Sequence, residues 1–417
     1  MKVFFINVVC GVGSTGRMCT EIAEALTGEG NAVEIAYGRG GVPADYRGTI
    51  YRVGNVGTLA ANLIRSRLFD AEGFGNRRAA EKLVAEIKRF APDVIHLHNL
   101  HGYYLNVQVL FDYLKEFQGA VIWTLHDCWA FTGHCAHYDA LGCQQWQLHC
   151  RECPALREYP ACLLSGRVDR NYTEKQRCFL GVPGMTLATP SYWLQEQVAQ
   201  SFLSGYDCQV IQNGIDHRKF YRDQSETATL RRQYHCEQKY LLLAVAYQWE
   251  ANKGLEDYIR LAAQLPDRYQ LVLVGTDSAV AAKLPKNMIA VPRTENIAQL
   301  RAWYNAADLF VNFTYNETFS LVNIEALACG TPVLTYHTGG SPECIDSTCG
   351  ADVEKGNVSL ALKEIMRICE ERPFSPESCM KRAALFRSSR QVKAYIALYQ
   401  QALESRRPQV PAAALSS

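Results

Sequence analysis

The sequence predicts an α/β protein made of two doubly wound halves, and three observations support this prediction. The chain has 417 residues, which is more than a single hydrophobic core usually holds. Short runs of Val, Ile and Leu alternate with amphipathic stretches in two successive series, which is typical of parallel sheets covered by helices. The runs are apolar on both faces, as strands buried from both sides must be.

Each series contains five expected strands and at least two expected helices. In the first series we expect strands at 2–9, 32–37, 93–98, 120–126 and 185–190, and helices at 15–26 and 77–90. In the second we expect strands at 239–247, 269–275, 288–292, 308–313 and 331–336, and helices at 254–265, 297–306 and 320–329. The halves should meet near 205–225, where Asn213-Gly214 predicts a turn. Ligands of such sheets bind at the carboxyl ends of the strands, so we expect two sets of strand ends across a shared cleft.

Composition argues against several other classes of protein. The formal net charge is +1, whereas a nucleic-acid-binding domain is usually strongly basic. The opening MKVFFINVVCGVG is followed by a glycine loop, which favours a buried strand over a signal peptide. No stretch approaches the length of a membrane span. We therefore expect a cytoplasmic protein whose sixteen cysteines are mostly reduced.

One basic run leaves two interpretations open. It carries Arg65, Arg67, Arg77, Arg78, Lys82, Lys88 and Arg89 against Asp70, Glu72, Glu81 and Glu86. Such a run is usually a solvated helix face. The alternative is a peripheral contact with the inner face of a membrane.

The stretch NETFSLVNIEALACGTP (316–332) carries two carboxylates that need an explanation, because a buried carboxylate is costly unless it is paired. We expect Ser320 to cap a helix that ends at Cys329, with Gly330 in a left-handed stop. The free N–H groups of Phe319, Ser320 and Leu321 would then form an anion site. Glu317 precedes that site and Glu325 follows it. Both carboxylates are therefore placed to accept hydrogen bonds from hydroxyls on either side of a bound diphosphate.

Several segments in the same order resemble retaining glycosyltransferases of family 4, which have the GT-B architecture of two Rossmann-like domains facing a cleft. These segments are the E-x7-E pair Glu317 and Glu325, HTGGSPE (337–343), IQNGIDHRKF (211–220) and NKGLEDYIRLA (252–262). GSTGR (13–17) and LHDCWAFTGHC (125–135) resemble a bacterial subgroup associated with capsule or exopolysaccharide synthesis. The resemblance spans nearly the whole chain.

The resemblance implies roles for individual residues. Glu325 would bind the ribose hydroxyls of a nucleotide-diphosphate sugar, and Glu317 would contact the donor sugar. Lys253 and the amides of 319–321 would neutralise the diphosphate as it leaves. The acceptor would be a saccharide or a lipid-linked oligosaccharide, whose hydroxyl attacks the donor sugar carbon with retention of configuration and without a dedicated base. No D-x-D motif lies near this site, so no catalytic cofactor or metal is expected.

At one position the sequence departs from the family pattern. The family usually has an arginine five residues before the lysine, and here that position is Gln248. Lysine lacks the bidentate fork of arginine, so the phosphate site would be weaker or completed by another residue. Arg293 and Arg17 are the two candidates.

In the first half, the resemblance implies that Gly13, Gly16 and Arg17 of the loop GVGSTGR face the cleft, although a plain glycine turn is the other interpretation. His126 ends an expected strand and would contact the donor sugar or the acceptor. Of the preceding histidines, we expect His96 in the core and His101 beside the acceptor.

A cysteine-rich insertion at about 128–162 is the least determined feature. Cys135, Cys143, Cys150 and Cys153 include one C-x2-C pair, which is compatible with a structural zinc ion. Buried thiols and a redox-sensitive pair are the alternatives.

These observations predict an N-terminal acceptor-side domain (1–205), a C-terminal nucleotide-sugar-binding domain (206–405) whose last helix packs back on the first, and a flexible tail (406–417). The resemblance implies a retaining hexosyltransferase of polysaccharide biosynthesis. A nucleotide-sugar epimerase and a non-catalytic nucleotide-sugar-binding protein are the alternatives.

Overall fold

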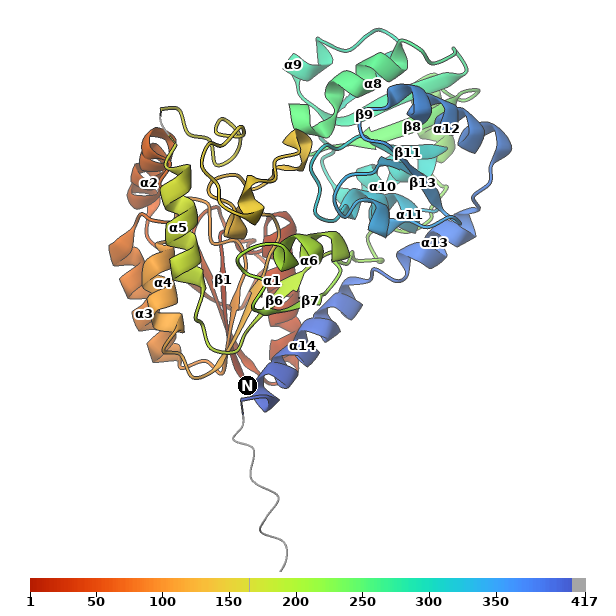
Figure 1. Ribbon diagram of the computed structural model, residues 1–417. Coiled ribbons are helices and arrows are strands. Elements are labelled where there is room, and N and C mark those ends of the chain that lie inside the picture. The colour runs from red at the N-terminus through yellow and green to blue at the C-terminus, as the bar shows by residue number, and fades with distance from the viewer. Residues whose placement is uncertain (165, 407–417) are drawn as a thin grey trace, which may run out of the picture. The chain divides into compact units, whose positions relative to one another are not determined.

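The computed structural model describes residues 1–164 and 166–406, and the chain divides into two compact units (Figure 1). Unit 1 contains residues 1–189, 194–211 and the chain from 392 onward. Unit 2 contains residues 190–193 and 212–391. The chain therefore enters unit 2 from unit 1 and later returns to it. The expected tail lies outside the described residues, apart from Arg406.

Unit 1 is built on a parallel sheet in the order β3-β2-β1-β4-β5-β6-β7. The strands are β1 (Lys2–Asn7), β2 (Ala32–Tyr37), β3 (Thr49–Arg52), β4 (Val94–Leu97), β5 (Ala120–Thr124), β6 (Met185–Thr189) and β7 (Asp207–Val210). All five expected strands of this half are present. The two strands that sequence patterns missed, β3 and β7, lie at the edges of the sheet.

The helices of the first half surround this sheet. They are α1 (Gly13–Gly28), α2 (Val56–Phe69), α3 (Arg77–Phe90), α4 (Val107–Leu114), α5 (Val168–Phe179) and α6 (Tyr192–Ala199). Three short 3₁₀ turns, at Trp129–Phe131, Asp139–Leu141 and Gln145–Gln147, occupy the cysteine-rich insertion.

Unit 2 contains the second parallel sheet, in the order β10-β9-β8-β11-β12-β13. Its strands are β8 (Tyr240–Val245), β9 (Tyr269–Thr276), β10 (Met288–Pro292), β11 (Leu309–Asn312), β12 (Val333–Tyr336) and β13 (Gly350–Val353). Its helices are α7 (Thr227–Gln233), α8 (Leu255–Ala262), α9 (Ser278–Ala281), α10 (Ile297–Ala306), α11 (Leu321–Ala328), α12 (Val358–Glu371) and α13 (Pro376–Ala383), with 3₁₀ turns at Ala251–Lys253 and Pro342–Cys344. The prediction of two doubly wound sheets is confirmed.

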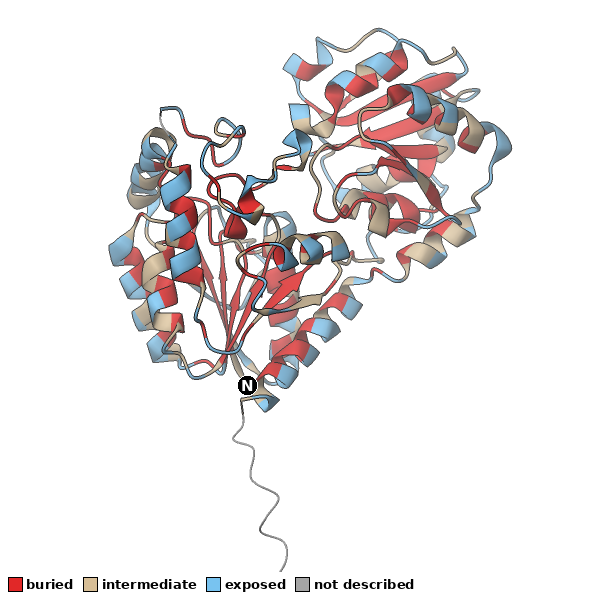
Figure 2. Cartoon of the chain, viewed as in Figure 1, coloured by how far each residue is buried: buried red, intermediate tan, exposed pale blue. Residues whose placement is uncertain are grey.

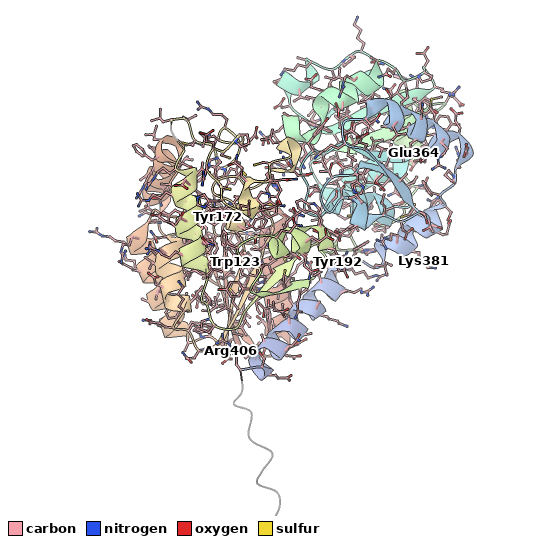
Figure 3. The ribbon with its side chains drawn as sticks, in the orientation of Figure 1. Trp123, Tyr172, Tyr192, Glu364, Lys381 and Arg406 are labelled. Carbon is pink, nitrogen blue, oxygen red and sulfur yellow. The ribbon has the colours of Figure 1, made fainter. Side chains whose placement is uncertain are left out.

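The central strands of both sheets are buried on both faces, as the apolar runs predict, and Figure 2 shows them in red. In β1 the side chains from Val3 to Ile6 are fully buried. Trp123 of β5, labelled in Figure 3, is also buried, and its indole N–H donates to the carbonyl oxygen of His98 at 3.1 Å. The sheets thus form rigid platforms from which the loops at the strand ends project.

The last helix, α14 (Ser388–Glu404), supplies core side chains to unit 1. Tyr395 and Tyr399 are fully buried there. The hydroxyl of Tyr399 lies 2.6 Å from Nδ1 of His96, and Thr124 Oγ1 donates to the Tyr395 hydroxyl at 3.1 Å. His96 is fully buried, as expected for a core histidine. Arg406 follows the helix and donates to the carbonyl oxygen of Gln118 at 3.0 Å (Figure 3).

The expected turn at Asn213-Gly214 is wrong. These two residues form no turn, and Ile215 pairs with Arg387 in an isolated parallel bridge. A Cβ on Gly214 would lie 2.6 Å from the backbone of Arg387 and Ser388. The glycine therefore serves the close approach of two chain segments and not a turn.

Among the described residues, no helix is long and apolar enough to cross a membrane.

Candidate active site

In unit 2 the strand order reverses between β8 and β11, and the loops after these two strands lie at the same edge of the sheet. Such a reversal point is where open parallel sheets bind ligands. The loop after β8 contains Lys253, and the loop after β11 contains Glu317 and leads into α11. The fold therefore brings together residues that lie more than sixty positions apart in the sequence.

The start of α11 has the expected helical geometry, with one correction. Ser320 occupies the N-cap position, but its side chain does not cap the helix. Ser320 Oγ instead accepts a hydrogen bond from the Asn312 amide at 3.0 Å, and Asn312 donates also to Asn323 at 2.8 Å. Because the side chain is engaged elsewhere, it does not occupy the first N–H groups of the helix, which are the groups that bind anions.

The C-terminus of α11 is as expected. Gly330 has φ +81° and follows the C-cap residue Cys329. Thr331 N donates to the carbonyl oxygen of Ala326 at 3.0 Å, which completes a Schellman motif.

Lys253 points toward this helix start. Its Nζ lies 3.9 Å from Glu317 Oε2 and 3.5 Å from Thr314 Oγ1. Glu317 Oε1 also accepts from the Phe319 amide at 3.4 Å. Both charged side chains are partly exposed, so they are accessible to a ligand. A cation, a carboxylate and a helix N-terminus thus lie side by side.

The glycine pair in HTGGSPE fixes the position of the Glu317 loop. Gly340 N donates to the carbonyl oxygen of Glu317 at 3.2 Å. Gly339 has φ +51°, and a Cβ there would lie 1.7 Å from that same oxygen. A Cβ on Gly340 would lie 2.1 Å from the carbonyl oxygen of Thr318. Two backbones pack directly against each other here, which only glycine permits.

Glu325 lies just over one turn inside α11 and is half buried. Its Oε2 accepts a hydrogen bond from the Tyr304 hydroxyl of α10 at 2.8 Å. This contact fixes the carboxylate on the side of the helix that faces α10. Burial and the charge of Glu325 raise the pKa of Tyr304 well above its ordinary value, so the phenol remains a donor at neutral pH.

Gln248 is exposed in the loop after β8. Arg293 follows β10, and its guanidinium lies 4.1 Å from the ring centroid of Tyr247, the neighbour of Gln248. Trp249 anchors the other side of the loop, because its indole N–H donates to the carbonyl oxygen of Val274 at 3.1 Å. A guanidinium therefore lies beside the position where the family pattern has an arginine.

In unit 1 the sheet reverses between β1 and β4, and the loop after β1 leads into α1. Gly11 N donates to the carbonyl oxygen of Gly16 at 3.0 Å, and a Cβ on Gly16 would lie 3.1 Å from Gly11 N. Gly13, with φ +65°, begins the helix and is exposed, as is Arg17. Gly16 thus closes the loop, whereas Gly13 and Arg17 are accessible.

A histidine cluster follows β4 and β5 in unit 1. Nε2 of His126 lies 3.0 Å from Nδ1 of His98, and the two rings stack with 5.3 Å between centroids. Burial lowers the pKa of His126 to about 4, so its imidazole is neutral at pH 7. Neutral imidazole can donate or accept a hydrogen bond without carrying charge.

Next to this pair, the imidazole of His101 makes hydrogen bonds to the carboxylate of Asp127 and the hydroxyl of Tyr159. Its Nε2 lies 2.7 Å from Asp127 Oδ2, and its Nδ1 lies 2.9 Å from the Tyr159 hydroxyl. Although burial acts to raise it, the charge and hydrogen bond of His101 hold the pKa of Asp127 below its ordinary value. Tyr159 comes from the cysteine-rich insertion, which therefore contributes to this strand-end cluster.

The insertion does not form the hypothesised zinc site in this structure. Within residues 1–164 and 166–406, no group of three or more His, Cys, Asp or Glu side chains is arranged to hold a metal ion. Cys135 and Cys150 are buried, and Cys143 and Cys153 are partly exposed. The thiols of Cys135 and Cys153 share a hydrogen bond, which is the main cause that lowers the pKa of Cys153 to about 7. The arrangement fits a pair of interacting thiols.

Buried polar residues hold the insertion in place. Lys175 of α5 is buried and donates to the carbonyl oxygens of Trp129 at 2.7 Å and Thr132 at 3.1 Å. Its Nζ also lies 3.7 Å from the Trp129 ring centroid. His134 and Asp70 form a fully buried pair at 2.5 Å. Spacing alone does not predict these contacts, because the partners lie far apart in the sequence.

Comparison with known proteins agrees with this geometry. Residues 239–371, which contain the site of unit 2, match the family model described as group 1 glycosyl transferases. A protein of Escherichia coli K12, named as a candidate colanic acid biosynthesis glycosyl transferase (WcaC), is 26% identical over 96% of this chain and 100% of its own length. A sucrose-phosphate synthase from Thermosynechococcus elongatus superposes with a TM-score of 0.69 at 19% identity, covering 97% of this chain and 99% of that one.

This chain is a glycosyltransferase with the GT-B fold.

A second solved structure has a ligand in its title. The Anabaena protein HepE in complex with UDP superposes with a TM-score of 0.66 at 14% identity, covering 96% of this glycosyltransferase and 100% of that chain. A curated relative from Bacillus subtilis, named as a candidate teichuronic acid biosynthesis glycosyltransferase (TuaC), is 27% identical over 48% of this chain and 50% of its own length. These comparisons do not support the two alternatives, a nucleotide-sugar epimerase and a non-catalytic nucleotide-sugar-binding protein.

Three site neighbours of the glycosyltransferase were missed from the sequence. Thr314 lies beside Lys253, Tyr304 holds Glu325, and Tyr159 holds His101. Each becomes visible only when two separate segments pack together. Only Thr314 could have been found from the sequence, because it directly follows a predicted strand and ligands bind at strand ends.

Proposed function

We propose that the chain is a retaining glycosyltransferase that moves a hexose from a nucleotide-diphosphate sugar to a saccharide or a lipid-linked acceptor in polysaccharide biosynthesis. The observation that supports it most is the juxtaposition of Lys253, Glu317 and the start of α11 at the reversal point of the second sheet. The names of the relatives, which concern colanic and teichuronic acid, support polysaccharide biosynthesis.

In this proposal the diphosphate binds at the start of α11. The amides of Ser320 and Leu321 donate to the phosphate oxygens, and Lys253 adds a positive charge. The Phe319 amide joins them when it leaves the carboxylate of Glu317. As the bond between the sugar carbon and the phosphate oxygen breaks, charge grows on the leaving oxygens. Groups that are fixed before the reaction stabilise that charge without reorganising.

The two glutamates bind hydroxyls on either side. Glu325, held by Tyr304, accepts from the ribose hydroxyls, and Glu317 accepts from the donor sugar. Binding of the diphosphate draws Lys253 away from Glu317, which leaves the carboxylate oriented toward the sugar. A carboxylate is a strong acceptor for hydroxyls, so this contact favours a hexose over the bare nucleotide.

Arg293 replaces the missing arginine in this proposal. It lies within the same unit as Lys253 and stacks on Tyr247, next to Gln248. Its forked guanidinium can bind two phosphate oxygens at once. In unit 1 the resemblance still implies a donor-side role for the accessible Gly13 and Arg17, whereas the buried Gly16 closes the loop that carries them.

The acceptor hydroxyl attacks the sugar carbon on the face from which the nucleoside diphosphate departs. The new bond joins the acceptor oxygen to the sugar carbon, and the acceptor proton passes to the departing phosphate oxygen. His126 is neutral at pH 7 and serves as a hydrogen-bonding group toward the donor sugar or the acceptor. No step in this scheme needs a separate base.

A donor screen tests the proposal. Nucleoside diphosphate release is measured for the uridine and guanosine diphosphate sugars, with and without an extract of cell lipids and saccharides. A transferase releases the diphosphate faster when the acceptor is supplied. Interconversion of nucleotide sugars without acceptor would identify an epimerase. Binding of a nucleotide sugar without turnover would identify a non-catalytic binding protein. A product whose anomeric carbon is inverted would reject the retaining mechanism.

A further inference from the structure

Unit 2 contains a cavity of about 360 Å³ that lies away from the candidate active site. It is bordered by Asp308, which precedes β11, and by Pro332, which precedes β12. Lys253 and Glu317 instead follow the strands β8 and β11. Because the strands of this sheet are parallel, the cavity lies at the edge opposite the candidate active site. Its volume is in the range typical of small-molecule sites.

Helix α11 connects this cavity with the candidate active site. Its N-terminus is the expected diphosphate site, whereas Cys329 and Gly330 at its C-terminus line the cavity. Arg222 packs over this C-terminal end, since a Cβ on Gly330 would lie 2.9 Å from its Nη1. Helix α11 packs beside α10 and α13, which also contribute lining residues (Figure 1). A ligand in the cavity would therefore contact the end of α11 opposite the donor site.

The charged side chains of the cavity are mainly arginines. Arg222, Arg231 and Arg372 line it, and Asp308 is the acid among its described lining residues. Arg231 and Asp308 neutralise each other, with 2.6 Å between Nη2 and Oδ2. Within the part of the chain that the structure describes, the guanidinium groups of Arg222 and Arg372 form no hydrogen bond or ion pair. These two groups therefore bring unpaired positive charge to the cavity.

Hydrogen bonds already satisfy the carbonyl groups at the end of α10 that border the cavity. Arg231 donates to the carbonyl oxygen of Ala306 at 2.7 Å, and Gln224 donates to that of Asn305 at 3.3 Å. The carbonyl groups at a helix C-terminus carry partial negative charge, so they attract cations when they are left unsatisfied. Because these carbonyls have partners, they compete little with a ligand for the two remaining guanidinium groups.

We propose that this cavity binds a small phosphorylated molecule, a phosphate monoester of the size of a sugar phosphate. The phosphate group binds Arg222 and Arg372, because each forked guanidinium matches two phosphate oxygens. A phosphate monoester carries nearly two negative charges at neutral pH, which balances two unpaired cations better than a single carboxylate does. The remaining lining, polar at Gln224 and Thr227 and apolar at Phe374, accommodates the attached group. The inference goes beyond the proposed function, which places no ligand at this edge of the sheet.

Isothermal titration calorimetry of the full chain with mannose 6-phosphate tests the inference. Neither donor nor acceptor is present, so the outcome is independent of the proposed function. Mannose and inorganic phosphate are the comparison ligands. We expect mannose 6-phosphate to bind at least about tenfold more tightly than either, because the arginines bind its phosphate while the rest of the lining contacts its sugar. Added salt should weaken the binding.

Substitutions show where the probe binds. Arg222→Ala and Arg372→Ala should each weaken the binding of mannose 6-phosphate by about tenfold or more. Arg232→Ala on α7, at an exposed arginine outside the lining, is the matched control. Lys253→Ala should keep the wild-type affinity, because the cavity is separate from the donor site. The altered arginines are exposed, so the unfolding midpoints should stay near that of the wild type.

Three results would overturn the inference. The first is a wild-type chain that binds mannose 6-phosphate no more tightly than mannose or inorganic phosphate. The second is binding that Lys253→Ala abolishes while Arg222→Ala and Arg372→Ala retain it, which would assign the probe to the donor site. The third is an equal loss of affinity in Arg232→Ala, which would indicate general charge attraction without a site.

Discussion

Lys253 and Glu317 form an ion pair with 3.9 Å between Nζ and Oε2, at the point where the strand order of the second sheet reverses. The distance is long for a salt bridge, and both side chains are partly exposed. Such a pair contributes little to stability. The ion pair instead orients the two side chains, because each partner holds the other near the start of α11.

Lys253→Ala should lower kcat/KM for transfer by about 10²–10³-fold, because the charge that grows on the leaving phosphate loses its cation. Glu317→Ala should lose most transfer as well, through loss of the sugar contact. Circular dichroism and the unfolding midpoint should stay near wild type. Lys363→Ala, at an exposed lysine of α12, serves as the control. Near-normal rates in both site variants would remove the assignment of this site.

Gly339→Ala should damage the site without touching a ligand. The added methyl would lie 1.7 Å from the Glu317 carbonyl oxygen, so the loop must move. We expect a higher donor KM and a fall of about 2–4 °C or more in the unfolding midpoint. Gly205→Ala, whose methyl would meet nothing within 4 Å, should leave both unchanged. Unaltered donor binding in Gly339→Ala would show that the loop position does not matter for the donor.

His126→Ala should lower kcat by about tenfold or more while the donor KM changes by less than about threefold. The reason is that a neutral imidazole at the strand end contributes to the reacting geometry more than to donor affinity. Steady-state kinetics with saturating acceptor measures both constants. His337→Ala, at an exposed histidine of unit 2, is the control. An unchanged kcat would return His126 to a structural role in the cluster with His98.

Acidification should destabilise unit 1 between pH 6.5 and about pH 4. Burial lowers the pKa of His126 to about 4 and that of His96 and His98 well below the ordinary value. Between those pH values the unfolded chain binds more protons than the folded one, so stability falls as pH falls. At pH 5 the loss is about 2 kcal/mol for His126, and His96 and His98 act in the same direction.

Glu34 changes the stability of unit 1 in the opposite direction as pH falls. Burial, with the neighbouring Glu86, raises the pKa of Glu34 to about 7, so its contribution increases as pH falls. The informative measurement is therefore a comparison of variants. The unfolding midpoint of His126→Asn should depend on pH less steeply than that of the wild type, by about one proton. Parallel curves for the two proteins would contradict the pKa direction of His126.

Cys153 should be alkylated with a half-maximal rate near pH 7. The hydrogen bond from Cys135 is the main cause that lowers the Cys153 pKa to about 7, while burial acts against it. Iodoacetamide labelling followed by peptide mass spectrometry measures the profile. Cys135→Ser should change the profile of Cys153, because a hydroxyl replaces the donating thiol. A wild-type profile centred near pH 9 would contradict the shared hydrogen bond.

Much of the fold was predictable because buried parallel strands have a local signature. All ten expected strands are present, and the predicted helix at 297–306 matches α10. Edge strands such as β3 lack the apolar run, because one side of the sheet edge is open to solvent. Helix α2 was missed as well. Its apolar side chains are exposed to solvent, whereas hydrophobic periodicity predicts helices whose apolar side chains face the core.

The site was predictable in part for the same reason. Lys253 and Glu317 each follow a strand, and the rule that ligands lie at strand ends places both at one edge. The side-chain role of Ser320 was wrong, because Asn312 competes for its hydroxyl group across the strand. The contact of Tyr304 with Glu325 depends on how α10 packs on α11, which periodicity does not specify.

The return of α14 to the first sheet means that unit 1 is not encoded by one continuous stretch of the gene. A fragment that stops at residue 211 would lack Tyr395 and Tyr399, so His96 and Thr124 would lose their hydrogen bonds to those two hydroxyls. Chimeras that exchange unit 1 between relatives must therefore be spliced at two junctions, and the C-terminal segment must be taken from the same protein as the N-terminal half.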